Sequence, residues 1–139
     1  MPGLRLIIVD DDAGIRYILR SLVESLGAEV VAEADNGEEA IRQTEHHHPE
    51  LVLMDVSMPV MGGLPATQYL SHHYPELRIL MVSQYNQKAY VREALRVGAN
   101  GYILKSAAAS ELGPAIHAVM NGGIFVSSAI ATRAAAANE

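Results

Sequence analysis

Short apolar runs recur along the chain, and most of them carry Val, Ile or Leu at consecutive positions. They cover residues 6–9, 30–32, 51–54, 79–82 and 102–104. A short run without alternating polar residues is typical of a strand that is buried on both faces of a sheet. The hydrophobic pattern therefore predicts five strands in the interior of the protein.

The segments between these runs place apolar residues at the three- and four-residue spacing of one helix face. Clear examples precede the second run and follow the fifth: Ile15, Leu19, Leu22, Leu26, Leu112, Ile116 and Val119. Gly27 and Gly98 follow two of these segments, as glycine often does at the end of a helix. Strand and helix therefore alternate, which predicts an α/β protein whose parallel sheet carries helices on both faces.

The composition narrows the class of protein. A length of 139 residues, 50% of them hydrophobic, fits one globular domain, and the absence of cysteine excludes disulfides and zinc-thiolate sites. No apolar stretch approaches the roughly 18 residues of a membrane span, and the N-terminus turns acidic too early for a signal peptide. We therefore expect a cytoplasmic protein with no membrane contact. The net charge of −6 disfavours binding to a phosphate backbone, so we expect no direct DNA contact by this segment.

Polar residues stand directly after most of the apolar runs. The residues with useful chemistry are Asp10, Asp11, Asp12, Asp55, Ser83 and Lys105. Ligands bind at the carboxyl ends of parallel strands, where these residues are expected to meet. Crowded carboxylates favour a bound cation, and oxygen ligands favour Mg²⁺. Asp55 stands alone at its strand end and is the best candidate for a phosphoryl acceptor, since a carboxylate can attack in line while a metal ion and a lysine stabilise the transferred oxygens.

Other conspicuous residues have structural interpretations. We expect Asp12 to cap the first helix by accepting hydrogen bonds from the amides of Gly14 or Ile15. The histidines at 46–48 and 72–73 are interpreted as solvated helix ends, because neighbouring residues on a helix point about 100° apart and do not share a face.

Four separate motifs together resemble the receiver (CheY-like) domain of two-component response regulators: "IIVDDD", "LVLMDVSMP", "MVSQY" and "GANGYILKS". The match covers about residues 4–121, in the expected order and spacing. The resemblance implies a flavodoxin-like (βα)5 three-layer sandwich with a parallel five-stranded sheet of order 2-1-3-4-5. It also implies a signalling domain rather than an enzyme, one that promotes its own phosphorylation and dephosphorylation.

The resemblance implies roles for Asp10, Asp11 and Asp55. Asp55 would accept a phosphoryl group from the phosphohistidine of a sensor histidine kinase or a phosphotransfer protein. Asp11, Asp55 and the backbone carbonyl of Ser57 would bind Mg²⁺, and Asp10 would act through water.

Further along the chain, the resemblance implies that Ser83 hydrogen-bonds one phosphoryl oxygen and that Lys105 pairs with another. Tyr102 matches the aromatic residue that turns inward when the serine moves to the phosphate. Such a switch biases an equilibrium between existing conformations, and one implied outcome of phosphorylation is a homodimer.

A rival interpretation starts from the same aspartates. Asp10 and Asp12 also form the D-x-D pattern of haloacid-dehalogenase-like magnesium phosphatases. That family needs a further acidic pair after its lysine, whereas only Glu111 and Glu139 follow Lys105 here. The rival also leaves Asp55 without a role, so the receiver is favoured.

The residues after the last predicted helix suggest a larger protein. We place a receiver domain at residues 1–122 and a linker or tail at 123–139. The stretch "HAVMNGGIFVSSAIA" resembles the linker of NarL/FixJ-type regulators, which leads into a LuxR-type helix-turn-helix domain. We therefore expect a transcription regulator whose effector domain is missing here; the alternative is a stand-alone phosphorelay receiver.

Overall fold

The structure is a computed structural model that describes residues 1–130, and its centre is one sheet of parallel strands. The strands are β1 Arg5–Val9, β2 Glu29–Ala34, β3 Leu51–Met54, β4 Arg78–Ser83, β5 Gly101–Leu104 and β6 Phe125–Val126. Their order across the sheet is β2-β1-β3-β4-β5-β6. The first five strands thus have the expected order 2-1-3-4-5, and the predicted fold class is confirmed.

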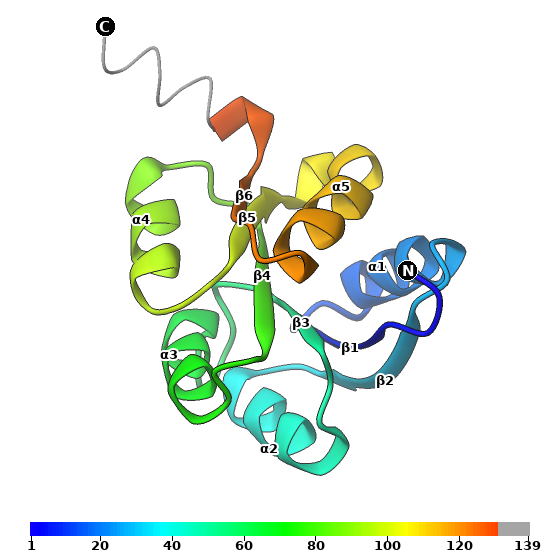
Figure 1. The fold of residues 1–139 in the computed structure, drawn as a ribbon. Helices are drawn as coiled ribbons and strands as arrows, with labels where there is room; N and C mark the ends of the chain where they lie inside the picture. The colour runs from blue at the N-terminus through cyan, green and yellow to red at the C-terminus, as the bar shows by residue number, and fades with distance from the viewer. Residues whose placement is uncertain (131–139) are drawn as a thin grey trace, which may run out of the picture.

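Helices cover both faces of this sheet (Figure 1). They are α1 Ala13–Ser25, α2 Gly37–His47, α3 Gly63–His73, α4 Lys88–Arg96 and α5 Ala108–Met120, with a short 3-10 helix at Lys105–Ala107. α1 and α5 pack together on one face, and α2, α3 and α4 lie on the other. Within the described residues, no helix combines the length and the apolar character that crossing a membrane would require.

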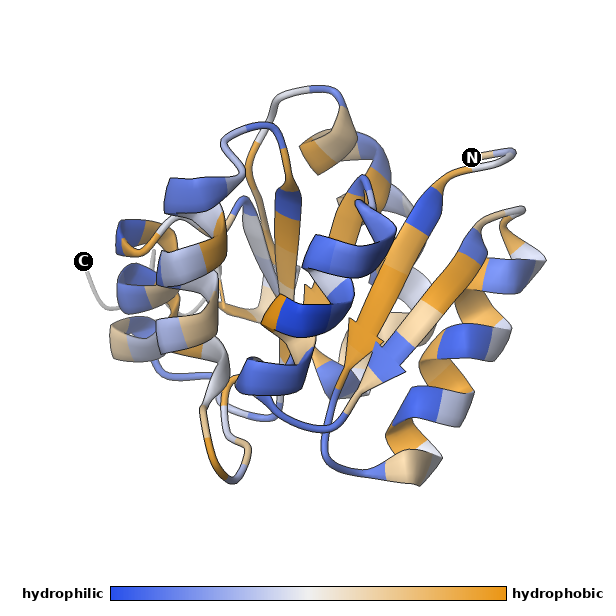
Figure 2. Ribbon diagram, turned by 90° about the horizontal axis from the view of Figure 1, so that it is seen from below, coloured by the Kyte–Doolittle hydropathy of each residue, from blue (hydrophilic) through white to orange (hydrophobic). Residues whose placement is uncertain are grey.

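The strands separate two apolar cores. In β1, Leu6 and Ile8 enter the core beneath α1 and α5, whereas Ile7 and Val9 enter the core beneath α2, α3 and α4. Figure 2 shows strands that are hydrophobic along most of their length between helices that alternate in hydropathy. Burial on both faces explains why β1, β3, β4 and β5 show consecutive apolar residues in place of an alternating pattern. The same expectation was wrong for β2, which lies at the edge of the sheet and is only half-buried along most of its length.

Side-chain caps determine where two of the helices begin. Asp12 Oδ1 accepts hydrogen bonds from the backbone N–H groups of Gly14 at 2.8 Å and Ile15 at 3.2 Å, which confirms the predicted cap of α1. Asn36 caps α2 by accepting from the Glu39 N–H at 2.9 Å. The Asp12 cap gives the chain a defined turn between the acidic residues that follow β1 and the first turn of α1.

The sheet extends further than predicted. Phe125 and Val126 form β6, which pairs with β5, so residues predicted to begin a tail instead add a sixth strand. The N–H of Ser127 prolongs this contact by donating to the Tyr102 carbonyl at 2.9 Å. A strand of two residues is too short to show a period in the sequence, and it forms because the edge of β5 offers unpaired backbone groups. Residues 131–139 of the predicted tail lie outside the described residues.

Candidate functional site

The register of the sheet brings the predicted site residues together at the carboxyl ends of the strands. Asp10 and Asp55 directly follow residues that pair between β1 and β3, so they leave neighbouring strands at the same level. Ser83 is the last residue of β4, and Lys105 directly follows β5. The chain thus presents carboxylates, a hydroxyl and an ammonium group along the carboxyl ends of four adjacent strands.

Three carboxylates converge at this edge. Asp10, Asp11 and Asp55 each offer an oxygen, and these oxygens all lie within 4.8 Å of one another. Asp10 and Asp55 are buried, with 1% and 4% of their surface exposed, whereas Asp11 is exposed. Anionic oxygen ligands are the set that hard divalent cations bind. The donor chemistry therefore fits Mg²⁺, with Asp11 as the ligand nearest to solvent.

The carboxylates line a hollow of about 320 Å³. Its lining also includes Ser57, Gln84, Tyr85 and Lys105, so the position predicted to offer a carbonyl to the metal lies beside the acidic residues. The sequence did not single out Gln84. A polar residue in a loop carries no signal that separates a lining side chain from an ordinary solvated one.

Lys105 sits between the two buried carboxylates. Its Nζ lies 2.8 Å from Asp10 Oδ2 and 3.3 Å from Asp55 Oδ2. Burial and the charge of Asp10 together raise the pKa of Asp55 to about 6, although Lys105 opposes the shift. Burial disfavours the charge of Lys105, but its contacts with Asp10 and Asp55 outweigh burial and raise its pKa. The ammonium group thus occupies the place between the carboxylates and partly neutralises them.

Hydrogen bonds and a close backbone contact fix the position of the chain around Asp55. Asp55 Oδ1 accepts a hydrogen bond from the N–H of Val56 at 2.8 Å, and the carbonyl of Val56 accepts one from the N–H of Gly63 at 2.8 Å. A Cβ at position 63 would lie 1.8 Å from the carbonyl oxygen of Asp55, so the start of α3 can approach only as glycine. The sequence shows paired glycines after β3, but it does not show what they approach.

Ser83 and Tyr102 both form hydrogen bonds with backbone groups of Tyr85. Ser83 is fully buried and its Oγ accepts a hydrogen bond from the N–H of Tyr85 at 3.0 Å. Tyr102, also fully buried, donates its hydroxyl to the carbonyl of Tyr85 at 2.7 Å, and burial raises its pKa. The ring of Tyr85 in turn stacks on Tyr90, with ring centroids 4.4 Å apart. Unlike the aspartates, Ser83 therefore contacts the β4–α4 loop rather than lining the hollow.

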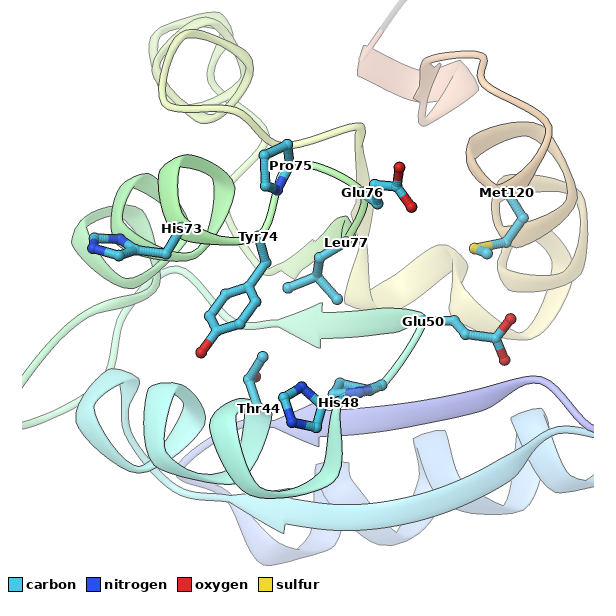
Figure 3. Close-up of a pocket in the computed structure, with 10 residues that line it drawn as sticks. Thr44, His48, Glu50, His73, Tyr74, Pro75, Glu76, Leu77 and Met120 are labelled. Atoms are coloured by element: carbon cyan, nitrogen blue, oxygen red, sulfur yellow. The ribbon is translucent and has the colours of Figure 1, made fainter.

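A larger hollow of about 580 Å³ lies at the opposite end of the strands (Figure 3). Thr44, His48, Glu50, His73 and Tyr74 are among the residues around it. Its histidines lie at the ends of α2 and α3, as the sequence predicted. This hollow contains none of the predicted site residues, and it adjoins the amino ends of β3 and β4, so its size does not make it the chemical centre.

Comparison with known proteins identifies relatives of this arrangement. Residues 6–117 match the response regulator receiver domain family. The chemotaxis protein CheY of Bacillus subtilis is 37% identical over 117 residues, which cover 84% of this chain and 98% of CheY. The transcriptional regulatory protein DegU of Brevibacillus brevis is 35% identical over 88% of this chain, but the match covers only 52% of DegU. The chain thus spans nearly the whole of one relative and about half of the other.

The fold has a similar counterpart among solved structures. A two-component response regulator of the LuxR family from Aurantimonas sp. superposes with a TM-score of 0.92 and 34% sequence identity. The superposition covers 98% of both chains, so the likeness includes β6 as well as the five predicted strands and their helices.

Proposed function

Because the chain belongs to the response regulator receiver family, we propose that Asp55 accepts a phosphoryl group and that this modification switches the domain between two conformations. Receiver domains are signalling domains whose partners are histidine kinases. One observation carries the proposal: a buried carboxylate at a strand end lies 3.3 Å from a lysine and within 4.8 Å of two further carboxylates. Such a carboxylate can act as a nucleophile, while the lysine and a cation held by the other carboxylates stabilise the negative charge of the phosphoryl group.

The proposed step is an in-line transfer from phosphohistidine. An oxygen of Asp55 attacks phosphorus, a P–O bond forms as the P–N bond breaks, and the imidazole of the donor leaves with the bonding electrons. A pKa of about 6 leaves Asp55 ionised at neutral pH, which a nucleophile requires. Lys105 is close enough to pair with a phosphoryl oxygen once Asp55 is modified.

Asp11, Asp55 and the carbonyl of Ser57 are the groups that we propose to hold Mg²⁺, with Asp10 in a supporting position through water. A bound ion would supply positive charge against the oxygens of the incoming phosphoryl group. The chain itself brings three carboxylates together in spite of their mutual repulsion, and it places Lys105 between two of them.

The proposed switch uses Ser83 and Tyr102. Ser83 does not line the hollow, so its Oγ has to turn toward the site before it can donate to a phosphoryl oxygen, and we infer that this rotation breaks the hydrogen bond from the N–H of Tyr85. The loss of that contact frees the β4–α4 loop on one side, while Tyr102 still holds the carbonyl of the same residue. Phosphorylation would thus redistribute the positions of Tyr85 and Tyr102 by changing one hydrogen bond at Ser83.

The proposed output is transcription control by a helix-turn-helix domain outside this chain. It is supported by the similarity to DegU, which is named a transcriptional regulatory protein, and by the similarity to a LuxR-family regulator. The alternative output is that of a single-domain receiver, supported by the match to nearly the full length of CheY. Homodimer formation on phosphorylation and a cytoplasmic location also stay predictions. The reading frame of the source gene separates the two outputs, since a stop codon directly after Glu139 would favour the single-domain receiver.

The experiment for the phosphoacceptor is incubation with a small-molecule phosphodonor and Mg²⁺, followed by intact-mass measurement. We expect the wild type to gain one phosphoryl group and Asp55→Asn to gain none. Asp12→Asn is the matched control, because asparagine also caps helices and Asp12 has no proposed chemical role. If the wild type gains no mass, or if Asp55→Asn is modified as fully as the wild type, the proposal is wrong. Catalytic turnover of a phosphate ester that is lost in Asp10→Asn would favour the phosphatase instead.

A further inference from the structure

Arg16 reaches from α1 to the backbone of the acidic residues. Its Nη1 donates a hydrogen bond to the main-chain carbonyl of Asp10 at 2.6 Å. The guanidinium binds this neutral carbonyl although the carboxylates of Asp10, Asp11 and Asp12 all lie in the same loop. Arginine commonly binds carboxylates through two parallel hydrogen bonds. A further contact must therefore keep the Arg16 guanidinium at the Asp10 carbonyl.

Glu33 of β2 holds the guanidinium in this position. Its Oε1 accepts from Arg16 Nε at 2.9 Å, and its Oε2 accepts from Arg20 Nε at 2.8 Å. Only 21% of the Arg16 side chain and 31% of the Glu33 side chain are exposed. Partial burial favours a neutral Glu33, but the two arginines outweigh it and lower the pKa of this carboxyl group, which keeps Glu33 charged at neutral pH. The three side chains form a charged brace between α1 and β2.

The contacts of Asp10 explain what this brace does. Its N–H donates to the carbonyl of Ala34 at 3.0 Å, its Oδ1 accepts from the N–H of Asp12 at 2.9 Å, and its Oδ2 pairs with Lys105. The remaining polar group of Asp10 is its carbonyl, and Arg16 binds it. This carbonyl belongs to the peptide unit that joins Asp10 to Asp11, so its orientation also directs the exposed carboxylate of Asp11.

We propose that Arg16 is a positioning residue for the divalent-cation site, and that Glu33 keeps its guanidinium on the Asp10 carbonyl and away from the carboxylates. The inference rests on the metal site of the proposed function. Arg16 touches neither the ion nor the phosphoryl group; it orients the Asp10–Asp11 peptide. Without Glu33, the same guanidinium would be free to pair with a carboxylate and compete with the cation.

The sign of the effect separates this role from a simple charge effect. Removal of a positive charge near three carboxylates would by itself tighten Mg²⁺ binding. Removal of a positioning contact weakens it, and losses of about tenfold or more are typical when groups that orient metal ligands are removed. We therefore expect Arg16→Met to bind Mg²⁺ several-fold more weakly than the wild type, in spite of the more negative site.

The experiment is calorimetric titration of Mg²⁺ into the unphosphorylated chain, with unfolding in urea measured separately. Arg16→Lys is expected to bind with intermediate affinity, since lysine can reach one acceptor but cannot bridge the carbonyl and Glu33. Glu33→Gln is expected to weaken binding in the wild-type background and to add little to Arg16→Met, because it acts through Arg16. Arg96→Met is the matched control: it removes an exposed arginine paired with Glu93 on α4 and should leave Mg²⁺ affinity unchanged.

Equal or tighter binding by Arg16→Met, with normal binding by the wild type, would overturn the inference and leave the proposed function intact. If the wild type binds no Mg²⁺, the metal site itself is wrong, and the inference fails with it. If Arg16→Met does not fold, Arg16→Lys and Glu33→Gln decide: wild-type affinity in both variants would also overturn the positioning role. A loss of stability in urea without a change in Mg²⁺ affinity would assign Arg16 a purely structural role.

Discussion

The carboxylate of Asp55 and the ammonium group of Lys105 lie 3.3 Å apart, and both side chains are largely removed from solvent. The pKa of each group is shifted by two opposing effects: burial disfavours the charged form, whereas the opposite charge nearby favours it. For Asp55, burial and the neighbouring Asp10 prevail and the pKa rises to about 6; for Lys105, the two carboxylates prevail and the pKa also rises. The relationship makes the site sensitive to pH and to any cation that can replace the lysine.

The raised pKa of Asp55 predicts how stability depends on pH without metal. Because the folded-state pKa is about 6 and the ordinary value is 3.8, the folded protein binds more protons than the unfolded chain between these values. Stability therefore falls as pH rises from about 4 to about 6, by at most about 3 kcal/mol. We expect the unfolding free energy of the wild type, measured in urea relative to Asp55→Asn, to decrease over this window. A difference that stays constant with pH would contradict the shifted pKa.

Loss of the lysine should make the acidic site dependent on metal. In Lys105→Met, Asp10 and Asp55 face each other without a cation, so we expect a loss of about 2 to 3 kcal/mol at neutral pH and a further rise in the pKa of Asp55. Mg²⁺ should restore most of this stability, because it supplies the missing positive charge. The measurement is unfolding in urea with and without Mg²⁺, with Lys88→Met as the control. The expectation fails if Mg²⁺ stabilises Lys105→Met no more than it stabilises the wild type.

Two glycine-to-alanine changes should differ strongly in their effect on stability. A Cβ at Gly63 would lie 1.8 Å from the carbonyl oxygen of Asp55, so Gly63→Ala must displace the start of α3 or the phosphoacceptor strand. We expect a loss of several kcal/mol together with slower phosphorylation. At Gly113, within α5, the nearest atom to a new Cβ is Leu26 Cδ1 at 3.7 Å, an ordinary contact. Gly113→Ala gains helix propensity, but residue 113 precedes Pro114, whose Cδ crowds a Cβ in the helical conformation. We therefore expect its unfolding free energy to change by less than about 1 kcal/mol, and urea unfolding of both variants checks the pair.

Ser127 and Glu111 should control how firmly the chain beyond α5 is held. The Ser127 hydroxyl donates to Glu111 at 2.5 Å and accepts from the N–H of Leu104 at 3.0 Å, beside the switch region of β5. Ser127→Ala removes the hydrogen bonds to the Glu111 carboxylate and from the Leu104 N–H. We therefore expect the unfolding free energy to fall by about 1 to 3 kcal/mol and the Leu104 amide to exchange faster. Ser110→Ala, which removes an exposed local hydrogen bond, is the control.

The same contact carries a pH dependence of its own. Partial burial favours a neutral Glu111, but hydrogen bonds from Ser127 and Ser128 outweigh it and lower the pKa of this carboxyl group. A lowered folded-state pKa contributes stability above the ordinary value of 4.5, and the contribution is lost as pH falls through the lowered pKa. Exchange at Leu104 should therefore accelerate in acid relative to other buried amides. If protection at Leu104 is the same in Ser127→Ala and the wild type, the contact does not hold this segment.

Much of the fold was predictable because it depends on local patterns. Consecutive apolar residues predicted β1, β3, β4 and β5, since strands buried on both faces need no alternation. The Asp12 cap was predictable because it uses amides two and three residues away. β6 was not predictable, because it has two residues and gains its hydrogen bonds from β5 rather than from a pattern of its own.

The sequence alone determined which groups are available for chemistry: carboxylates after β1 and β3, a serine at the end of β4 and a lysine after β5. It also determined that these groups share one edge, because parallel strands align their carboxyl ends. Only the tertiary structure decided their relations: Lys105 between Asp10 and Asp55, Ser83 held by Tyr85, and Arg16 turned to a carbonyl by Glu33. The physical reason is that charges and hydrogen bonds act over a few ångströms between segments distant in the chain, whereas hydrophobic periodicity acts along it.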